Sequence, residues 1–166
     1  MKITEAKAEF IQAWGTLGSS WGINRTMSQI HALLIVSKDP LSAEDIMDQL
    51  KISRGNANMN IRALMDWGLV KKQLVPGERK EFFSAGKDIA EVARQIAKER
   101  KRREIDPILN AMESLKNVEG EDEETKEFKK VISEIADFTQ KVDGTLDKFI
   151  RSDRNWFYKT AIKLIR

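Results

Sequence analysis

The stretch ISRGNANMNIRALMDWGLV, residues 52–70, decides how this sequence is interpreted. Ala57, Ile61 and Leu64 recur at i, i+4 and i+7, the spacing of one face of an α-helix. The first turns nevertheless carry Gly55 and three asparagines, at positions 56, 58 and 60, although glycine costs a helix about 1 kcal/mol relative to alanine. A helix of this composition must be held by packing on one face, which leaves the other face available for another purpose.

The residues just before this stretch predict a partner helix. Ser42 can cap a helix, and Asp45 at the third position completes a capping box. The apolar spacing i, i+3, i+4 and i+7 is met by Ala43, Ile46, Met47 and Leu50. Residues 51–53 form a short turn in which Ser53 caps the next helix. Two short helices joined by such a turn indicate a helix-turn-helix.

The residues after this stretch change from a helical to a strand pattern. Gly68 is suited to end the helix, and residues 69–75 are typical of a strand. Pro76 and Gly77 fit the centre of a type II turn, and residues 80–84 fit the returning strand. A hairpin placed directly after a helix-turn-helix is a wing. We therefore expect a mainly α fold with a small β-hairpin, a winged helix-turn-helix.

The two ends of the chain predict further helices. Residues 3–21 form an amphipathic stripe, and Gly15, Gly18 and Gly22 predict a bend at its far end. Asn24 can cap a second helix, which Pro40 must end. Asp88 and Glu91 begin a long helix that we expect to restart at Asp106-Pro107.

After an acidic linker near residues 117–124, apolar residues recur in steps of three and four, which suits a helix packed against a partner helix. These residues are Phe128, Val131, Ile132, Ile135, Phe138, Val142, Leu146, Phe149 and Ile150. Asp153 is expected to cap a last short helix that contains Trp156. We thus expect an N-terminal dimerisation helix (1–22), a winged helix-turn-helix (23–87) and a helical dimerisation region (88–166).

Composition excludes several functional classes. The 166 residues suit one domain or a small domain with an extension. No cysteine is present, so disulfides, thiol catalysis and cysteine zinc sites are excluded. No segment resembles a signal peptide or a membrane span, and we expect a cytoplasmic protein that has no membrane partner. Nor is there a glycine-rich phosphate loop or a nucleophile elbow, so we expect no enzyme, no cofactor and no metal site.

The polar face of residues 54–66 suggests what the helix binds. With Ala57, Ile61 and Leu64 in the core, Gly55, Met59 and Arg62 lie on the opposite face and Asn56 and Asn58 flank it. Asparagine can pair with adenine and arginine with guanine in the major groove, and a recognition helix enters that groove by its N-terminal residues. Glycine allows close approach to phosphate. The candidate DNA-binding residues are Ser42, Ser53, Arg54, Gly55, Asn56, Asn58, Met59, Arg62, Lys71, Lys72, Arg79 and Lys80.

Three other features have competing interpretations. The basic run KERKRRE, residues 98–104, could contact DNA, but a solvated face or pairing with the acids of 119–124 fits its position better. His31 is the only histidine, and its apolar neighbours place it in the core or at its edge. The aromatic residues Trp14, Trp21, Trp67, Trp156, Phe157 and Tyr158 could form a cage for a quaternary ammonium ligand, or simply pack in the core or a dimer interface.

The motifs SRGNANMNIRALMDWGLV and PGERKEFF resemble the MarR superfamily of winged-helix regulators, and within it the GbsR-like branch associated with choline and glycine betaine uptake. The matching residues include Pro40-Leu41-Ser42, Ile46, Leu50, Ser53 to Asn56, Asp66 to Val70, Gly77 to Lys80 and Trp14-Gly15. The likeness extends over residues 10–105. It implies a homodimer joined by its terminal helices that binds a pseudo-palindromic operator, and it defines no ligand residues.

We therefore expect a homodimeric, sequence-specific regulator of transcription that binds double-stranded DNA and acts as a repressor. A protein-interaction winged helix without specific DNA readout is the alternative, because the net charge is only +3. A small choline-like cation acting as effector is compatible with the first hypothesis. The operator, the regulated genes and the effector cannot be read from the sequence.

Overall fold

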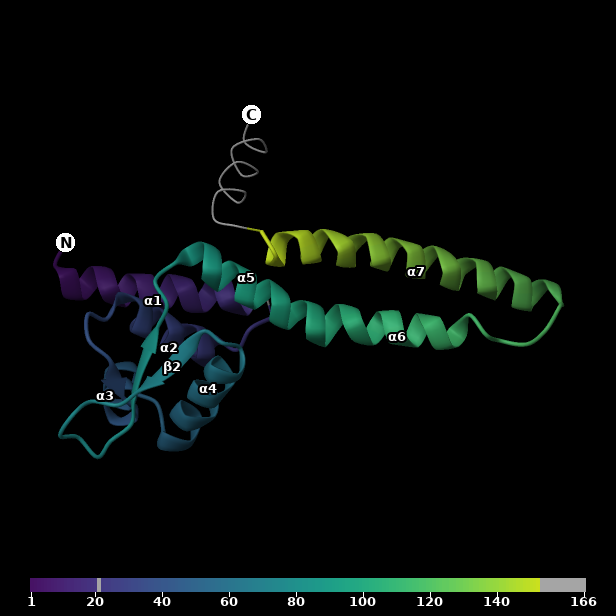
Figure 1. Cartoon of the computed structure of the whole chain (residues 1–166). Coiled ribbons are helices and arrows are strands. Elements are labelled where there is room, and N and C mark those ends of the chain that lie inside the picture. The colour runs from purple at the N-terminus through teal and green to yellow at the C-terminus, as the bar shows by residue number, and fades with distance from the viewer. Residues whose placement is uncertain (21, 153–166) are drawn as a thin grey trace. The chain divides into compact units, whose positions relative to one another are not determined.

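The computed structural model of the chain describes residues 1–20 and 22–152 (Figure 1). It contains two compact units, Met1–Val92 and Ala93–Arg166. Trp21 and the expected last helix from Asp153 lie outside the described residues. Within the described residues no helix is long and apolar enough to cross a membrane.

The first unit has the predicted order of helices followed by a hairpin. Its elements are α1 (Ile3–Ser20), α2 (Arg25–Val36), β1 (Leu41–Ser42), α3 (Ala43–Leu50), α4 (Arg54–Asp66), β2 (Val70–Gln73) and β3 (Phe82–Ala85). The mainly helical winged-helix prediction is therefore confirmed.

The predicted helix starts are present as hydrogen bonds. The Asn24 side chain accepts from the backbone N–H groups of Thr26 and Met27. Ser42 and Asp45 form the reciprocal capping box, with the Asp45 carboxylate 2.8 Å from the Ser42 backbone nitrogen. These bonds form between residues two or three apart, which is why the sequence alone reveals them.

The wing is part of a three-stranded antiparallel sheet in the order β1-β3-β2. Leu41 pairs with Phe83, an arrangement the sequence did not predict, because a two-residue strand has no measurable alternation. The turn between β2 and β3 has Gly77 at φ +85° and a hydrogen bond from the Glu78 N–H to the Val75 carbonyl, 3.1 Å. A positive φ after proline is the type II geometry that was expected.

The core of the first unit is built where the helices meet. Ile30 of α2, Ile46 of α3 and Leu64 of α4 are its largest fully buried side chains. Ala57 and Ile61 are also buried, so the predicted core face of α4 is confirmed. This packing holds a helix whose own residues are poor helix formers.

The glycines of α1 allow α2 to approach closely. Helix α1 continues through Gly15 and Gly18 to Ser20, and both glycines are buried. A Cβ atom added at Gly18 would lie 2.7 Å from the Cβ of Ser28, and one at Gly15 would lie 2.7 Å from Cγ of Gln29. The bend that we expected is therefore absent at Gly15 and Gly18. These two glycines instead allow close contact between α1 and α2.

Gly18→Ala is expected to lower the free energy of unfolding by about 1–3 kcal/mol, because the new methyl group overlaps Ser28 and the two helices must separate. Urea denaturation at one protein concentration measures this effect. Gly144→Ala in α7 is the matched control: a Cβ there meets nothing within 4 Å, and it should stabilise the chain by about 0.5–1 kcal/mol. Equal stability of the wild type and Gly18→Ala would contradict the close-contact interpretation.

The second unit is helical in the part that the structure describes. Helix α5 (Ile89–Arg100) crosses the boundary between the units, and the π-helical turn η1 (Lys101–Ile105), α6 (Asp106–Leu115) and α7 (Glu123–Ile150) follow. Asp106 has helical backbone angles, so it does not cap a restarted helix as we expected. Instead, the Asp106 N–H bonds to the Lys101 carbonyl, and this wider turn accommodates Pro107, which has no N–H to donate.

The basic run pairs locally rather than with the acids of 119–124. Glu99 is buried and lies within 2.6 Å of Arg102. The pKa of the Glu99 carboxyl is lowered, chiefly by its hydrogen bond from the Arg102 side chain and further by that from Arg103. Lys101 bonds to Asp106 at 2.8 Å and to Asp143 of α7 at 2.5 Å. The pair between Lys101 and Asp143 joins the η1 turn to α7.

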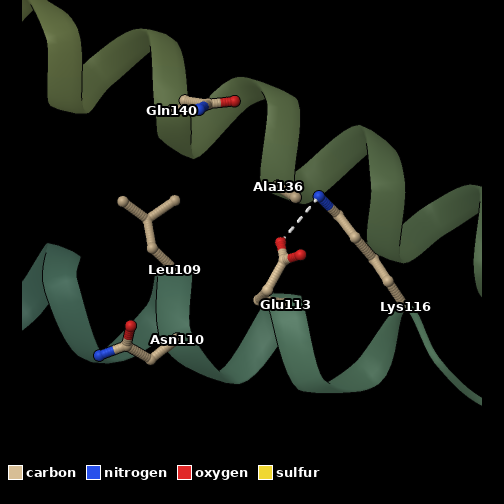
Figure 2. A pocket seen from close by; sticks show the side chains of 6 residues that line it. All are labelled: Leu109, Asn110, Glu113, Lys116, Ala136 and Gln140. Atoms are coloured by element: carbon tan, nitrogen blue, oxygen red, sulfur yellow. Dashed lines mark hydrogen bonds and ion pairs between the residues drawn. The ribbon is translucent and has the colours of Figure 1, made fainter.

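Helices α6 and α7 run antiparallel and pack against each other (Figure 1). Ile132, Ala136 and Thr139 are the buried residues of α7. A cavity of about 250 Å³ lies between the two helices (Figure 2). Its lining includes no aromatic side chain and consists of Leu109, Asn110, Glu113, Lys116, Ala136 and Gln140.

Candidate nucleic-acid interface

The N-terminus of α4 is presented to solvent by the turn that precedes it. Lys51 adopts the left-handed conformation, with φ at +55°, and ends α3. Ser53 then caps α4, its Oγ accepting from the Asn56 N–H at 3.3 Å. The first N–H groups of a helix carry partial positive charge, so this end of α4 suits an anionic ligand.

The face of α4 opposite the core is exposed as predicted. Arg54, Gly55, Asn58 and Arg62 are exposed, and Met59 is 59% exposed despite being apolar. A Cβ at Gly55 would meet nothing within 4 Å, so the glycine is not required by contacts of the chain with itself. Since glycine also costs helix stability, an advantage of Gly55 would have to come from contact with a bound partner.

Asn60 has a different role from the asparagines beside it. It is 3% exposed, and its amide donates to the Asn56 carbonyl at 2.8 Å and to the Asn56 Oδ1 at 2.7 Å. Asn56 is only half-exposed as a result. Asn58 is therefore the asparagine of α4 whose side chain is exposed and has no hydrogen-bond partner among residues 1–20 and 22–152.

The wing supplies cations of two kinds. Lys71 and Arg79 are exposed and have no ion pair with any described residue, and the same holds for Arg62 on α4. Lys72 is paired with Glu81 across the hairpin. Because successive strand residues point to opposite faces, Lys71 leaves β2 on the outer face and Lys72 on the face of buried Phe83, its cross-strand partner. Lys71 is the better placed of the two for an external anion.

Glu44 in the first turn of α3 joins the wing to α4. Its carboxylate lies 2.9 Å from the Lys80 Nζ and 4.0 Å from an Arg54 guanidinium nitrogen. The hydrogen bond to Glu44 raises the pKa of Lys80. The sequence analysis missed Glu44. Its only local signal was an acid in the first turn of a helix, which is common and does not identify a partner 36 positions away.

Ser42 is the one predicted site residue that the fold buries. It is 4% exposed, and its hydroxyl accepts from the Asp45 N–H at 3.2 Å and donates to the Asp45 carboxylate at 2.6 Å. The hydrogen bond from the Ser42 hydroxyl to this carboxylate, and next the one from the Ser42 backbone N–H, lower the pKa of Asp45. In this conformation Ser42 supports the start of α3 and offers no free hydroxyl to an external ligand.

The winged-helix segment matches a known family in sequence. Residues 21–81, from the end of α1 to the wing, fit the model of the MarR family. This segment is therefore similar in sequence to the MarR family. A comparison with curated protein sequences found no match.

A solved structure shares the fold. A protein described as "Crystal Structure of a transcriptional regulator" superposes with a TM-score of 0.67 at 18% identity, covering 87% of this chain and 95% of the solved one. At that identity the likeness concerns the fold.

Glu44→Gln is expected to strengthen binding to duplex DNA by about two- to fivefold at low salt, if the wing and the start of α4 contact phosphate. The change frees Lys80 and Arg54 and removes a carboxylate from the surface that would face phosphate, and exposed ion pairs are weak enough to be exchanged. Fluorescence anisotropy at two salt concentrations measures the change, which should shrink at high salt.

Glu113→Gln is the matched control, because Glu113 is paired with Lys116 at 3.2 Å on an exposed face of the second unit. It should leave DNA binding unchanged. Unchanged or weaker binding by Glu44→Gln would mean that Arg54 and Lys80 lie away from the DNA.

Proposed function

We propose that the chain is a sequence-specific, DNA-binding regulator of transcription that acts in the cytoplasm as a homodimeric repressor. Each α4 enters a major groove of the operator, and each wing contacts the adjoining backbone. In this arrangement Asn58 and Arg62 contact bases, Met59 lies against a thymine methyl group, and the start of α4 contacts phosphate through Ser53, Arg54 and Gly55. Lys71, Arg79 and Lys80 add phosphate contacts from the wing.

The observation that carries the proposal is the exposed face of α4. Asn58 and Arg62 are one helical turn apart, exposed, and without a hydrogen bond or ion pair to any described residue. They stand on a helix that Ala57, Ile61 and Leu64 anchor in the core. Amide and guanidinium groups presented on a rigid helix are the donors and acceptors that read adenine and guanine in the major groove.

Selection from random duplex DNA tests this proposal directly. The expected result is a pseudo-palindromic consensus whose half-sites lie about 34–36 Å apart or a multiple of that distance. The same chain carrying Asn58→Ala and Arg62→Ala should lose the consensus. Recovery of no enriched sequence by the wild-type chain would overturn the proposal.

The alternative is a winged helix that binds another protein and only nonspecific DNA. One observation favours it: Arg54, Lys72 and Lys80 are already paired with glutamates, which weakens the field that the surface presents to phosphate. The selection separates the two candidates, because a protein-binding surface would enrich no DNA sequence.

The GbsR-like resemblance suggests a choline-like cation as effector. Phe10 and Trp14 of α1 lie with ring centroids 5.5 Å apart, and Trp14 lies 6.3 Å from the His31 ring. The cavity of about 250 Å³ in the second unit has no aromatic lining, and neither does one of about 270 Å³ lined by residues of α1, α2 and α3. We propose that a choline-like cation would bind against the Phe10 and Trp14 rings. Calorimetry with choline tests it, and absence of heat with the wild-type chain would remove it.

A further inference from the structure

Helix α7 carries two apolar stripes, and only one of them is covered by residues of 1–20 and 22–152. The first consists of Ile132, Ala136 and Thr139, which are buried in the second unit. The second is the exposed seam, which we define as Phe128, Val131, Ile135, Phe138 and Val142. Phe138 is 69% exposed, Phe128, Val131 and Ile135 are also exposed, and Val142 is half-buried.

The exposed seam has the repeat of a coiled coil. Its residues are separated by steps of three, four, three and four, which places them at the a and d positions of successive heptads. At 100° per residue the seam lies beside the buried stripe on the helix surface, not behind it. A helix that already packs against α6 on one face therefore presents a second packing face to a further helix.

The charges beside the seam indicate which helix that is. The g positions of the same heptads are Glu127, Glu134, Lys141 and Lys148, and all four are exposed. None of them has an ion pair with another residue of 1–20 or 22–152. The row is acidic in its first half and basic in its second half, so it is complementary to itself when reversed.

We propose that the exposed seam is an interface between two copies of this chain, with the two α7 helices antiparallel. In that arrangement the g rows face each other, so Glu134 meets Lys141 of the second copy and Glu127 meets Lys148 of the second copy. The seam residues then interlock in the same register: Phe138 lies opposite Ile135 and Val131 opposite Val142. A two-fold axis makes each contact occur twice.

The e positions of the same heptads lie on the other side of the seam and carry no charge. They are Ile132, Thr139 and Leu146. A parallel pair of helices would place g beside e, leaving the four charges without partners. The inference names an interface for the homodimer of the proposed function. It is argued from the residues of α7 alone.

Charge exchange between chains tests the antiparallel pairing. One variant carries Glu127→Lys and Glu134→Lys, and the other carries Lys141→Glu and Lys148→Glu. Sedimentation should show each variant alone dimerising at least about tenfold more weakly than the wild type, because every g pair becomes a like-charge pair. Mixing the two variants should restore dimers of mixed composition, since every pair is then complementary.

A core substitution provides a second readout. Phe138→Asp should abolish the dimer without unfolding the second unit, because the side chain is mostly exposed within one chain. Leu74→Asp, at an apolar residue of the wing loop that is 86% exposed, is the control and should leave the dimer intact. Unchanged dimerisation by Phe138→Asp, or no recovery on mixing the charge variants, would overturn the proposal, as would a monomeric wild-type chain.

These measurements are made without DNA, so they fail independently of the proposed function. A palindromic consensus from a chain whose dimer ignores the charge variants would keep the regulator and reject this interface. Mixed dimers from a chain that selects no DNA sequence would keep the interface and reject the regulator.

Discussion

Replacing Arg62 with alanine is expected to weaken binding to the selected operator by about 10- to 100-fold while changing binding to unrelated duplexes much less. Arg62 is exposed on the face of α4 opposite Ile61 and Leu64, and it has no ion pair among the described residues. A bidentate contact from arginine to guanine contributes about 1–3 kcal/mol of discrimination against the wrong base. The loss should therefore appear as relaxed specificity at one base pair of each half-site, measured by competition between operator variants.

Arg79→Ala is the control that separates loss of a backbone contact from loss of base readout. Arg79 lies in the wing loop, so its loss should weaken all sequences similarly and reduce the slope of log affinity against log salt by about 1. Arg62→Ala should instead change specificity more than the salt slope. The same uniform loss from both variants would show that α4 contacts the backbone and does not read bases.

Acid is expected to destabilise the fold through His31 by about 2 kcal/mol at pH 5 and about 3 kcal/mol at pH 4. His31 is 2% exposed, and burial lowers its pKa from 6.5 to about 4. Its Nε2 has no hydrogen-bond partner among the described residues, so nothing there compensates the charged form. The unfolded chain binds this proton first, and stability is therefore complete above pH 6.5 and is lost as the pH falls towards 4.

Urea denaturation at pH 7.5, 6 and 5 measures this loss in the wild type and in His31→Leu. The stability of each chain at pH 7.5 is its own reference, and from that reference His31→Leu should lose less stability with acid than the wild type. The carboxylates with lowered pKa values, Asp45, Glu99 and Asp122, are common to both chains and cancel in the difference. Parallel pH profiles would show that the His31 proton is accommodated in the folded state.

The sequence by itself determined the features that depend on neighbouring residues. The caps at Ser42 and Ser53, the type II turn at Gly77 and the buried face of α4 all follow from spacings of one to four positions. The exposure of Asn58 and Arg62 follows from the same periodicity, because fixing one face of a helix fixes the opposite one. The poor helix formers of residues 52–70 are thus explained at positions 55 and 58 as an exposed surface.

Features that join residues far apart in the chain could be found only in the tertiary structure. The burial of Asn60, the pairing of Leu41 with Phe83, the contact of Gly18 with Ser28 and the link from Glu44 to Lys80 have no local pattern. Each requires two elements to meet, and the meeting point is set by how the whole core packs. The same holds for α7: periodicity identified its apolar residues together, but only the packing of α6 against Ile132 and Ala136 separated the covered stripe from the exposed one.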